Sequence, residues 1–159
     1  MSTSPNTTQR MPLAYRVIFA ILDIALPVMG IAFNVLNPLQ ALGNFTPHPT
    51  SPINLETHVL LDCTSGFFAA LAFVNVYLLI YRPHDLVVWK GLVGGVFLQD
   101  LFMIRGFLQE LAMRNGSPAV AGWSGQDWGN VAGYSVIALV RALFVLGVGV
   151  GSNAKQRGN

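Results

Sequence analysis

The sequence contains few charged residues. Asp, Glu, Lys and Arg make up 10% of its 159 residues, whereas hydrophobic residues make up 53%. A soluble domain usually carries about 25% charged residues, so these proportions argue against a water-soluble protein. No charged residue occurs from Ile24 to Leu55 or from Cys63 to Tyr81. Each run can hold the roughly 20 apolar residues that cross about 30 Å of hydrocarbon.

The sequence also lacks the features on which several functions depend. Its single cysteine, Cys63, can form neither an internal disulfide nor a cysteine cluster for a metal. A net charge of +2 does not suggest a nucleic-acid surface. There is no Gly-rich phosphate loop, Gly-x-Ser-x-Gly elbow or two-histidine metal motif, and His48 and His84 have no ligand residues nearby. We therefore expect no metal, no cofactor and no nucleic-acid partner.

The hydrophobic pattern predicts an all-α fold, an integral membrane four-helix bundle of antiparallel, up-down topology. The predicted spans are Pro12 to Val35, Thr57 to Ile80, Leu86 to Phe107 and Trp128 to Val150. They make up one domain, residues 11–151, between a disordered N-terminal tail, residues 1–10, and a basic C-terminal tail, residues 152–159. Prolines 38, 47, 49 and 52 predict a non-helical first loop. The short connection Tyr81 to Asp85 predicts that the second and third spans are neighbours.

Basic residues predict the direction of the spans. They gather before the first span, at the second connection and after the fourth span: Arg10, Arg16, Arg82, Lys90, Lys155 and Arg157. The first loop has none, and the third has only Arg114. By the positive-inside rule, both termini face the cytosol and loops one and three face the lumen. The triplet Asn44-Phe45-Thr46 then predicts N-glycosylation of Asn44 on the lumenal side.

Charged residues within a membrane span usually face the bundle interior and mark function. Among the charged residues of the predicted spans, the candidates for such a role are Asp23, Asp62, Asp100 and Arg141. Counted from the predicted lumenal ends, Asp23 and Arg141 lie at one level, so an ion pair between them is geometrically possible. Asp62, Asp100 and Tyr134 share a second level nearer the lumen. Two acids at one level repel unless one is protonated or a cation lies between them, so Asp62 and Asp100 are the candidate catalytic residues, with Tyr134.

Helical spacing predicts that these groups face one cavity. Steps of three and four residues align polar or small side chains along spans one, two and four. The three stripes are Arg16, Ala20, Asp23, Pro27, Gly30 and Asn34; His58, Asp62, Ser65 and Ala69; and Asn130, Tyr134 and Arg141.

Supporting roles in this cavity have alternatives. Asp23 and Arg141 either set the electrostatic field of a site or only fix helix register. His58 is either a proton relay or a solvated interfacial histidine, and Arg105 either binds substrate or lies at the interface. Asn130 is expected to orient the substrate together with Tyr134.

Several short motifs resemble a family of small four-span fungal membrane proteins that carry a domain of unknown function. They are Pro12-Leu13-Ala14-Tyr15-Arg16, the mid-span acid Asp23, Asp100, Trp128-Gly129-Asn130 and Arg141-Ala142-Leu143-Phe144. The resemblance covers about residues 11–151. Relatives often have a proline directly after the first acid, here displaced to Pro27, and a histidine three residues after the third-span acid, where this chain has Met103. An Asp-His pair in the third span is therefore not expected.

The resemblance implies a context of membrane cyclases, isomerases and epoxide hydrolases of fungal secondary metabolism, with a lipophilic substrate and a location in the endoplasmic reticulum. Taken with the acids, it suggests a cofactor-independent enzyme that opens an epoxide by hydrolysis or cyclisation, or isomerises its substrate. Asp62 or Asp100 would donate the proton. The alternative is a non-catalytic protein that binds membrane lipid or stabilises a complex, with a second copy of the chain or pathway enzymes as partners.

Overall fold

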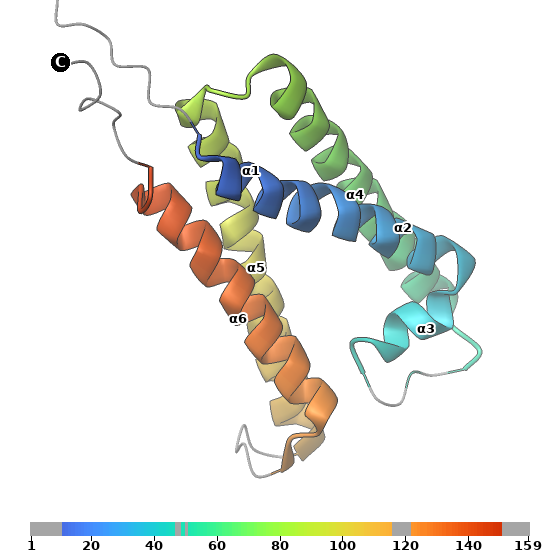
Figure 1. Cartoon of the computed structure of the whole chain (residues 1–159). Coiled ribbons are helices and arrows are strands. Elements are labelled where there is room, and N and C mark those ends of the chain that lie inside the picture. Colours follow the sequence, from blue (N-terminus) through green and yellow to red (C-terminus); the bar gives the residue numbers. More distant parts are fainter. Residues whose placement is uncertain (1–10, 47–48, 50, 116–121, 151–159) are drawn as a thin grey trace, which may run out of the picture.

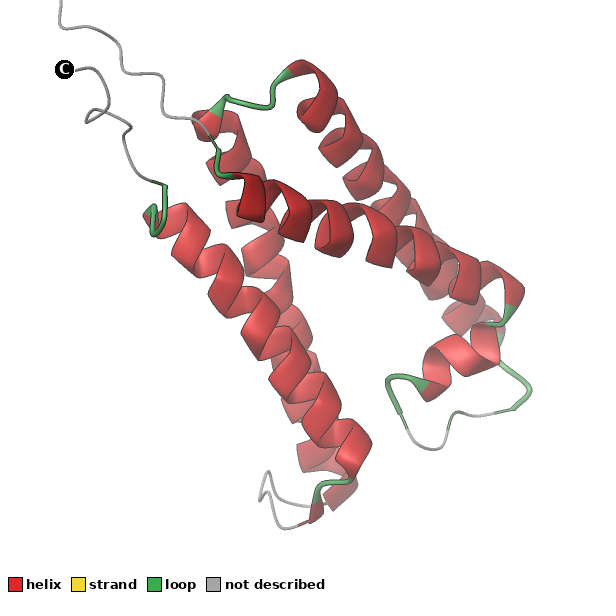
Figure 2. Cartoon of the chain, in the orientation of Figure 1, coloured by secondary structure: helices red, strands yellow, loops and turns green. Residues whose placement is uncertain are grey.

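The computed structural model describes residues 11–46, 49, 51–115 and 122–150. All regular secondary structure in these residues is helical (Figure 2). The predicted tails, residues 1–10 and 152–159, lie outside the described residues, as do parts of the first and third loops.

Within the described residues, four helices are long and apolar enough to cross a membrane, as predicted. The first span is continuous but has three parts, an α-helix, a π-helical turn and a second α-helix. The elements are α1 (Leu13–Ala20), η1 (Ile21–Ala25), α2 (Leu26–Leu36), α3 (Pro38–Gly43), α4 (Leu55–Tyr81), α5 (Leu86–Asn115) and α6 (Gly125–Leu146).

The outer surface of these helices is apolar. In the most hydrophobic 18-residue stretch, only 28% of the residues of α4 and 17% of those of α6 are buried. Large side chains such as Phe73, Phe102 and Leu139 are between 58% and 69% exposed. Such surfaces are unfavourable in water over four helices but match lipid tails, which indicates a small membrane protein.

The spans form two pairs that meet at one end of the molecule. In Figure 1 the first span crosses the others obliquely, so that α2 packs along α4 while α5 packs along α6. The α1 part lies against the beginning of α5 and the end of α6. We call this meeting point the core end, and the opposite end the α3 end. The short connection makes α4 and α5 neighbours at the core end, and toward the α3 end they diverge (Figure 1).

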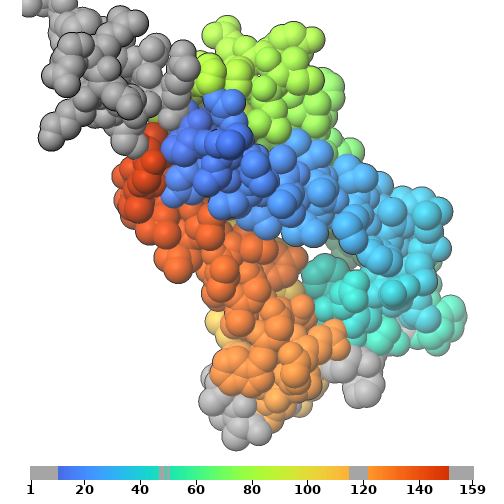
Figure 3. All heavy atoms as spheres, in the orientation of Figure 1, coloured from blue at the N-terminus to red at the C-terminus, as the bar shows by residue number. Residues whose placement is uncertain are grey.

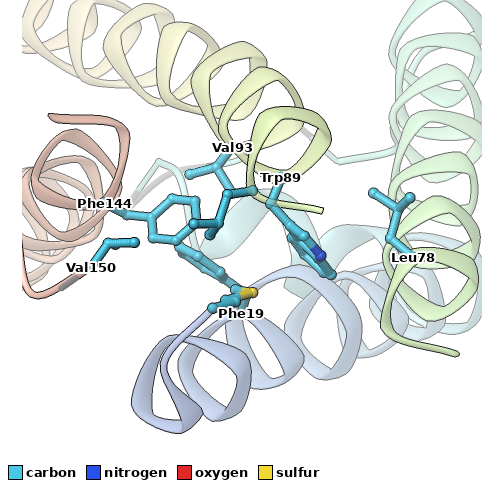
Figure 4. Packing of buried hydrophobic residues seen from close by; sticks show 8 residues of the cluster. Phe19, Leu78, Trp89, Val93, Phe144 and Val150 are labelled. Atoms are coloured by element: carbon cyan, nitrogen blue, oxygen red, sulfur yellow. The ribbon is translucent and has the colours of Figure 1, made fainter. Parts of the chain in front are cut away.

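A hydrophobic cluster from all four spans fills the core end (Figure 4). Phe19, Trp89 and Phe144 are fully buried, and the ring centroid of Phe19 lies 5.0 Å from that of Phe144 and 6.4 Å from that of Trp89. The indole Nε1 of Trp89 donates a hydrogen bond to the carbonyl of Arg82. Because lipid is itself apolar, this cluster stabilises the fold by close packing rather than by removing surface from water.

Helix ends follow from local capping chemistry. Asn54 accepts a hydrogen bond from the backbone of Thr57 at 2.8 Å and starts α4, while Ser124 and Asp127 form a capping box that starts α6. Gly147, in the left-handed conformation with φ of 87°, ends α6 four residues before the predicted limit at Val150. α5 continues eight residues past the predicted end at Phe107, because residues 108–115 contain no proline or glycine.

The first loop is partly helical, which corrects the prediction that its prolines stop a helix. Pro38 occupies the first turn of α3, where its missing N–H costs nothing. The side chain of Asn37 caps this helix by accepting a hydrogen bond from the backbone N–H of Gln40. A proline directly after a capping residue is thus a start signal here rather than a stop.

The π-helical turn η1 surrounds Asp23 and has an identifiable cause. Pro27 lies four residues after Asp23 and has no N–H to donate to the Asp23 carbonyl, so the regular hydrogen-bond ladder is broken at this point. Asp23 and Pro27 are both buried. Turns of this kind occur frequently at functional sites.

Candidate functional site

Three charged side chains meet inside the molecule. The guanidinium of Arg141 donates one hydrogen bond through Nη1 to Oδ2 of Asp100 and another through Nη2 to Oδ1 of Asp23. Asp23 is 1% exposed, and Asp100 and Arg141 are each 4% exposed. We call these residues the triad. The ion pair between Asp23 and Arg141, which their shared level made geometrically possible, is formed, and Asp100 joins it.

The triad links both helix pairs. Asp100 and Arg141 come from α5 and α6, which pack together, whereas Asp23 comes from the π-turn of the first span. The bond from Arg141 to Asp23 therefore crosses between the pairs. Two polar atoms of the triad, Oδ2 of Asp23 and Nε of Arg141, are buried without a hydrogen-bond partner among the described residues. Two carboxylates share one guanidinium, so the triad contains one more acid than base.

Asp100 was expected at a shallower level, beside Asp62, and this expectation is wrong. The predicted end of the third span at Phe107 was too early, since α5 runs to Asn115. Asp100 is 15 residues before that end, and Arg141 is 16 residues after the start of α6 at Gly125. At 1.5 Å per residue the two side chains lie at the same depth, which permits their contact.

Asp62 lies on the exposed face of α4, seven residues after its start, and does not line the cavity described below. Neither a hydrogen bond nor an ion pair joins it to any described residue, so the expected pairing of Asp62 with Asp100 is not formed. His58 and Ala69 of the same predicted stripe are also exposed. The buried face of α4 instead carries Leu61, Ser65, Leu71, Ala72, Asn75 and Leu78. Ser65 is the one member of the predicted stripe that is buried, and its hydroxyl accepts a hydrogen bond from the amide of Asn34, so the prediction is right for Ser65 and wrong for His58, Asp62 and Ala69.

A cavity of about 210 Å³ lies between the helix pairs and is lined by two members of the triad, Asp100 and Arg141, and by Ala41 of α3. The first pair contributes a mainly apolar wall, and the second pair contributes most of the polar groups. Apolar residues from α2, α4 and the segment after α3 include Leu26, Phe33, Phe45, Phe67, Phe68 and Leu71. Polar residues from α5 and α6 are Gln99, Asp100, Tyr134 and Arg141. Asp100 and Arg141 thus face the cavity, whereas Asp23 stands behind them.

Two further polar side chains on this wall are available to a ligand. Neither the hydroxyl of Tyr134 nor the amide of Gln99 forms a hydrogen bond to a described residue, and both residues are partly buried. The ring of Tyr134 packs on Phe107 with a centroid distance of 5.3 Å, which fixes its position. Tyr134 was predicted from its spacing to Arg141, while Gln99 was missed because an uncharged amide beside Asp100 gave no separate signal.

The segment around α3 covers one end of the cavity. The amide of Gln126 donates to the carbonyl of Gly43, and the amide of Asn130 donates to the carbonyl of Asn44 at 2.9 Å. Asn130 therefore holds α3 against α6 and does not line the cavity, contrary to the expectation that it orients a substrate. Phe45 stacks on Phe107 with a centroid distance of 6.0 Å and adds a third link.

Asn44 is exposed, and it lies at the rim of the cavity. Arg105 is also exposed, on α5, and does not line the cavity. Nowhere in the described ranges do three His, Cys, Asp or Glu side chains gather in a way that could hold a metal ion. The chemistry that the described residues offer at the cavity is that of a carboxyl group, a guanidinium, a phenol and an amide.

A comparison with known families places the chain. Residues 8–151 match a domain of unknown function, DUF7704, so the chain belongs to the DUF7704 family. The comparison with curated proteins and the comparison with solved structures gave no match.

Proposed function

We propose that this member of the DUF7704 family is an integral membrane enzyme that performs acid/base chemistry on a lipophilic fungal secondary metabolite. The reaction is the opening of an epoxide, by hydrolysis or by cyclisation, or an isomerisation. The observation that carries the proposal is a buried acid, Asp100, on the polar wall of an otherwise apolar cavity. Intramembrane acids in this position are costly and usually functional.

The charges of the triad support a stored proton. If Asp23 and Asp100 were both ionised, the three groups would carry a net charge of −1 in an apolar environment, which is unfavourable. One proton on the pair of acids restores neutrality. Because Asp100 lines the cavity and Asp23 does not, the proton that reaches a ligand is the one on Asp100.

The proposed reaction balances without a cofactor. Asp100 donates its proton to the epoxide oxygen as a carbon–oxygen bond breaks, and this oxygen becomes a hydroxyl group. Water, or a hydroxyl of the substrate itself, attacks the carbon and returns a proton to the Asp100 carboxylate. Product and substrate then differ by one water after hydrolysis, and have equal mass after cyclisation or isomerisation.

Arg141, Asp23 and Tyr134 position the reacting groups and do not themselves exchange protons with the substrate. Arg141 holds the carboxyl group of Asp100, and Asp23 holds Arg141 from the opposite side. The hydroxyl of Tyr134, which has no hydrogen-bond partner in the described part of the chain, can orient the epoxide oxygen or the attacking nucleophile.

Metabolite profiling of the source organism tests this function and does not require an identified substrate. Three strains are compared, with the gene intact, deleted, or replaced by the Asp100→Asn variant, and immunoblots check protein levels. We expect the variant to match the deletion, with loss of one product and accumulation of a lipophilic precursor of equal mass or one water lighter. A variant strain that keeps the product would refute the role of Asp100. Asp62→Asn, on the exposed face, is the matched control and should retain the product.

The alternative is a non-catalytic protein that binds membrane lipid or stabilises a complex. The exposed polar residues His58 and Asp62, one turn apart on the outer face of α4, favour it because they offer contacts to a partner protein. Partners would be a second copy of the chain or enzymes of the same pathway. Purification in mild detergent distinguishes this alternative from the enzyme. A stoichiometric partner that co-purifies with the natural chain and is lost from the Asp62→Ala variant would support a role as a complex subunit. A chain that purifies without any partner would oppose that role.

We also propose an antiparallel, up-down topology in the endoplasmic reticulum, with both termini in the cytosol and the α3 end in the lumen. The distribution of basic residues supports this orientation. Endoglycosidase treatment of the expressed protein tests it. A mobility shift that disappears on Asn44→Gln supports the orientation. The triplet Asn6-Thr7-Thr8 is a second acceptor pattern, before the first span, and a shift that disappears on Asn6→Gln would contradict the orientation.

A further inference from the structure

We infer that the cavity takes a neutral, long-chain oxygenated lipid, with its oxygen at Asp100 and Tyr134 and its chain reaching from the cavity into the bilayer. This inference deepens the proposed function because it names the substrate class of the same site. It rests on the charge of the triad, the apolar wall of the cavity, and the size and exposure of that wall.

The charge of the triad excludes an anionic head group. Arg141 already serves two carboxylates, Asp23 and Asp100, so the site holds no uncompensated positive charge for a carboxylate or phosphate. A hydroxyl, ether or epoxide oxygen can instead accept a proton or hydrogen bond from Asp100 or Tyr134, and can accept one from the amide of Gln99. A neutral oxygen on a hydrocarbon skeleton fits this set.

The opposite wall selects an apolar chain. Phenylalanine rings from three segments line it, namely Phe33, Phe45, Phe67 and Phe68. These rings provide dispersion contacts and no hydrogen-bonding atoms, so a polar chain would lose its bonds to water without replacement. The chain of the ligand is therefore hydrocarbon.

The cavity is too small to enclose a whole long-chain lipid. A volume of about 210 Å³ lies below the roughly 300–1,000 Å³ of pockets that enclose drug-sized molecules. Four apolar lining residues are also substantially exposed, namely Leu26 at 44%, Phe33 at 37%, Phe45 at 37% and Phe67 at 43%. The lining of the cavity thus extends to the outer surface of α2, of α4 and of the segment after α3.

The shape of the molecule agrees with a lateral opening. On the face shown in Figure 3, α1 and α6 touch at the core end, whereas α2 runs away from α6 toward α3. The bonds from Gln126 and Asn130 close the α3 end. Between these two closures the helix pairs are separated by the cavity, which leaves the side of the molecule as the route from the bilayer.

Photolabelling of the purified chain in lipid nanodiscs tests the inference. The probes are a hexadecanol with a diazirine in its chain and the matched hexadecanoic acid. We expect the alcohol to label peptides that contain Phe33, Phe67 or Phe68, and the acid to label them about tenfold less, equivalent to ~1.4 kcal/mol of binding. Equal labelling by both probes would overturn the selection for a neutral group.

A bulky substitution inside the cavity provides the second measurement. Met103 lines the cavity and is partly buried, so Met103→Trp should fill it and remove labelling of these peptides. Leu101, on the same helix but exposed, gives the matched control Leu101→Trp, which should label as the natural chain does. Labelling that persists in Met103→Trp, or that spreads evenly over the outer faces, would show adventitious contact with the lipid surface.

The outcome separates this inference from the proposed function. Asp100→Asn should keep cavity labelling while it removes the product in the metabolite assay. If the cavity is labelled but Asp100→Asn has no metabolic effect, the protein binds lipid and the proposed enzyme function is refuted. If Asp100→Asn has a metabolic effect but the cavity is not labelled, the proposed enzyme function is supported and the inferred substrate class is overturned.

Discussion

Arg141 of α6 binds Asp23 of the first span across the interface between the two helix pairs. This bond holds the two helix pairs together at the middle of the spans, as the hydrophobic cluster does at the core end. It therefore fixes the position of the first pair relative to the second. Removing one partner of a buried ion pair is strongly destabilising, since it leaves an uncompensated charge. The triad therefore has a structural role that any test of its chemical role must take into account.

The first prediction concerns the stability of the triad. Arg141→Leu leaves two acids without a cation and should cost roughly 3–5 kcal/mol, whereas Asp23→Asn leaves the neutral pair of Arg141 and Asp100 and should cost less. Thermal aggregation of the detergent-solubilised protein measures both. Arg105→Leu, at an exposed position, should leave the midpoint unchanged. If Asp23→Asn is as unstable as Arg141→Leu, the triad does not behave as a shared ion pair.

A second prediction concerns Tyr134 and separates chemistry from stability. Tyr134→Phe keeps the ring contact with Phe107 and removes only the hydroxyl, which forms no hydrogen bond to a described residue. We expect unchanged thermal stability and a turnover lower by about 10²-fold, the lower range for a positioned acid or base. Initial rates in microsomes, with the substrate identified by metabolite profiling, provide the measurement. A normal rate would remove Tyr134 from the site.

The levels of the charged residues show how much of the site the sequence could predict. Counting residues from predicted span ends placed Asp23 and Arg141 together correctly, since these ends were nearly right. The same count failed for Asp100 because the true end of α5 lies eight residues beyond Phe107. Hydropathy marks where a helix becomes polar, not where it stops, so depth inferred from hydropathy alone was too shallow.

Which face of each helix points inward was predicted from the spacing of its polar residues. In the first span the polar stripe from Asp23 to Asn34 is the buried or partly buried face, as predicted. In α4, His58, Asp62 and Ala69 of the predicted stripe are exposed and only Ser65 is buried, although the spacing is equally regular. Close to the end of a span a polar side chain can reach water from the outer face, so only mid-span polar residues reliably indicate the interior. Nothing in a single sequence specifies the wall of phenylalanines, which requires the relative positions of α2 and α4.

A third prediction addresses the π-turn. Pro27→Ala restores an N–H that can donate to the Asp23 carbonyl, so the span can become a regular α-helix and rotate Asp23 away from Arg141. Although alanine has the higher helix propensity, we expect a lower thermal midpoint and loss of the Asp100-dependent activity. Pro38→Ala, at the first turn of α3, is the control and should change little. A more stable Pro27→Ala protein with full activity would mean that the π-turn is not required.

A fourth prediction concerns the closure of the cavity by α3. Asn130→Ala removes the hydrogen bond to the Asn44 carbonyl, which is worth about 0.5–1.5 kcal/mol, and should loosen α3 without unfolding the spans. The exposed Cys63 is the only cysteine, so Cys63→Ala gives a background for a single reporter at the buried Ala41. Ala41→Cys should react faster with a water-soluble maleimide when Asn130→Ala is added. Equal rates would show that the hydrogen bond does not hold α3.

The last prediction uses a close contact between α2 and α4 beside the cavity. A Cβ added at Gly30 of α2 would lie 2.8 Å from the Phe68 ring of α4, so Gly30→Ala forces this ring to move. The adjacent free space is the cavity, since both residues line it. We therefore expect Gly30→Ala to reduce the cavity volume and to weaken photolabelling by the alcohol probe. A clash in a filled core costs roughly 1–3 kcal/mol of stability. Because the ring can move into the cavity, Gly30→Ala should cost less than that, and the thermal midpoint should fall only slightly.

The control for this change lies on the facing helix. Gly66→Ala adds a Cβ that meets no atom within 4 Å, so it should alter neither labelling nor stability. The double variant Gly30→Ala with Phe68→Leu removes the clashing ring and should regain labelling, because the shorter side chain leaves space for both the new methyl group and the ligand. Failure of the double variant to regain labelling would mean that the loss came from a shift of α2 against α4 rather than from the ring in the cavity. In that case the wall of phenylalanines would not be the surface on which the lipid chain lies.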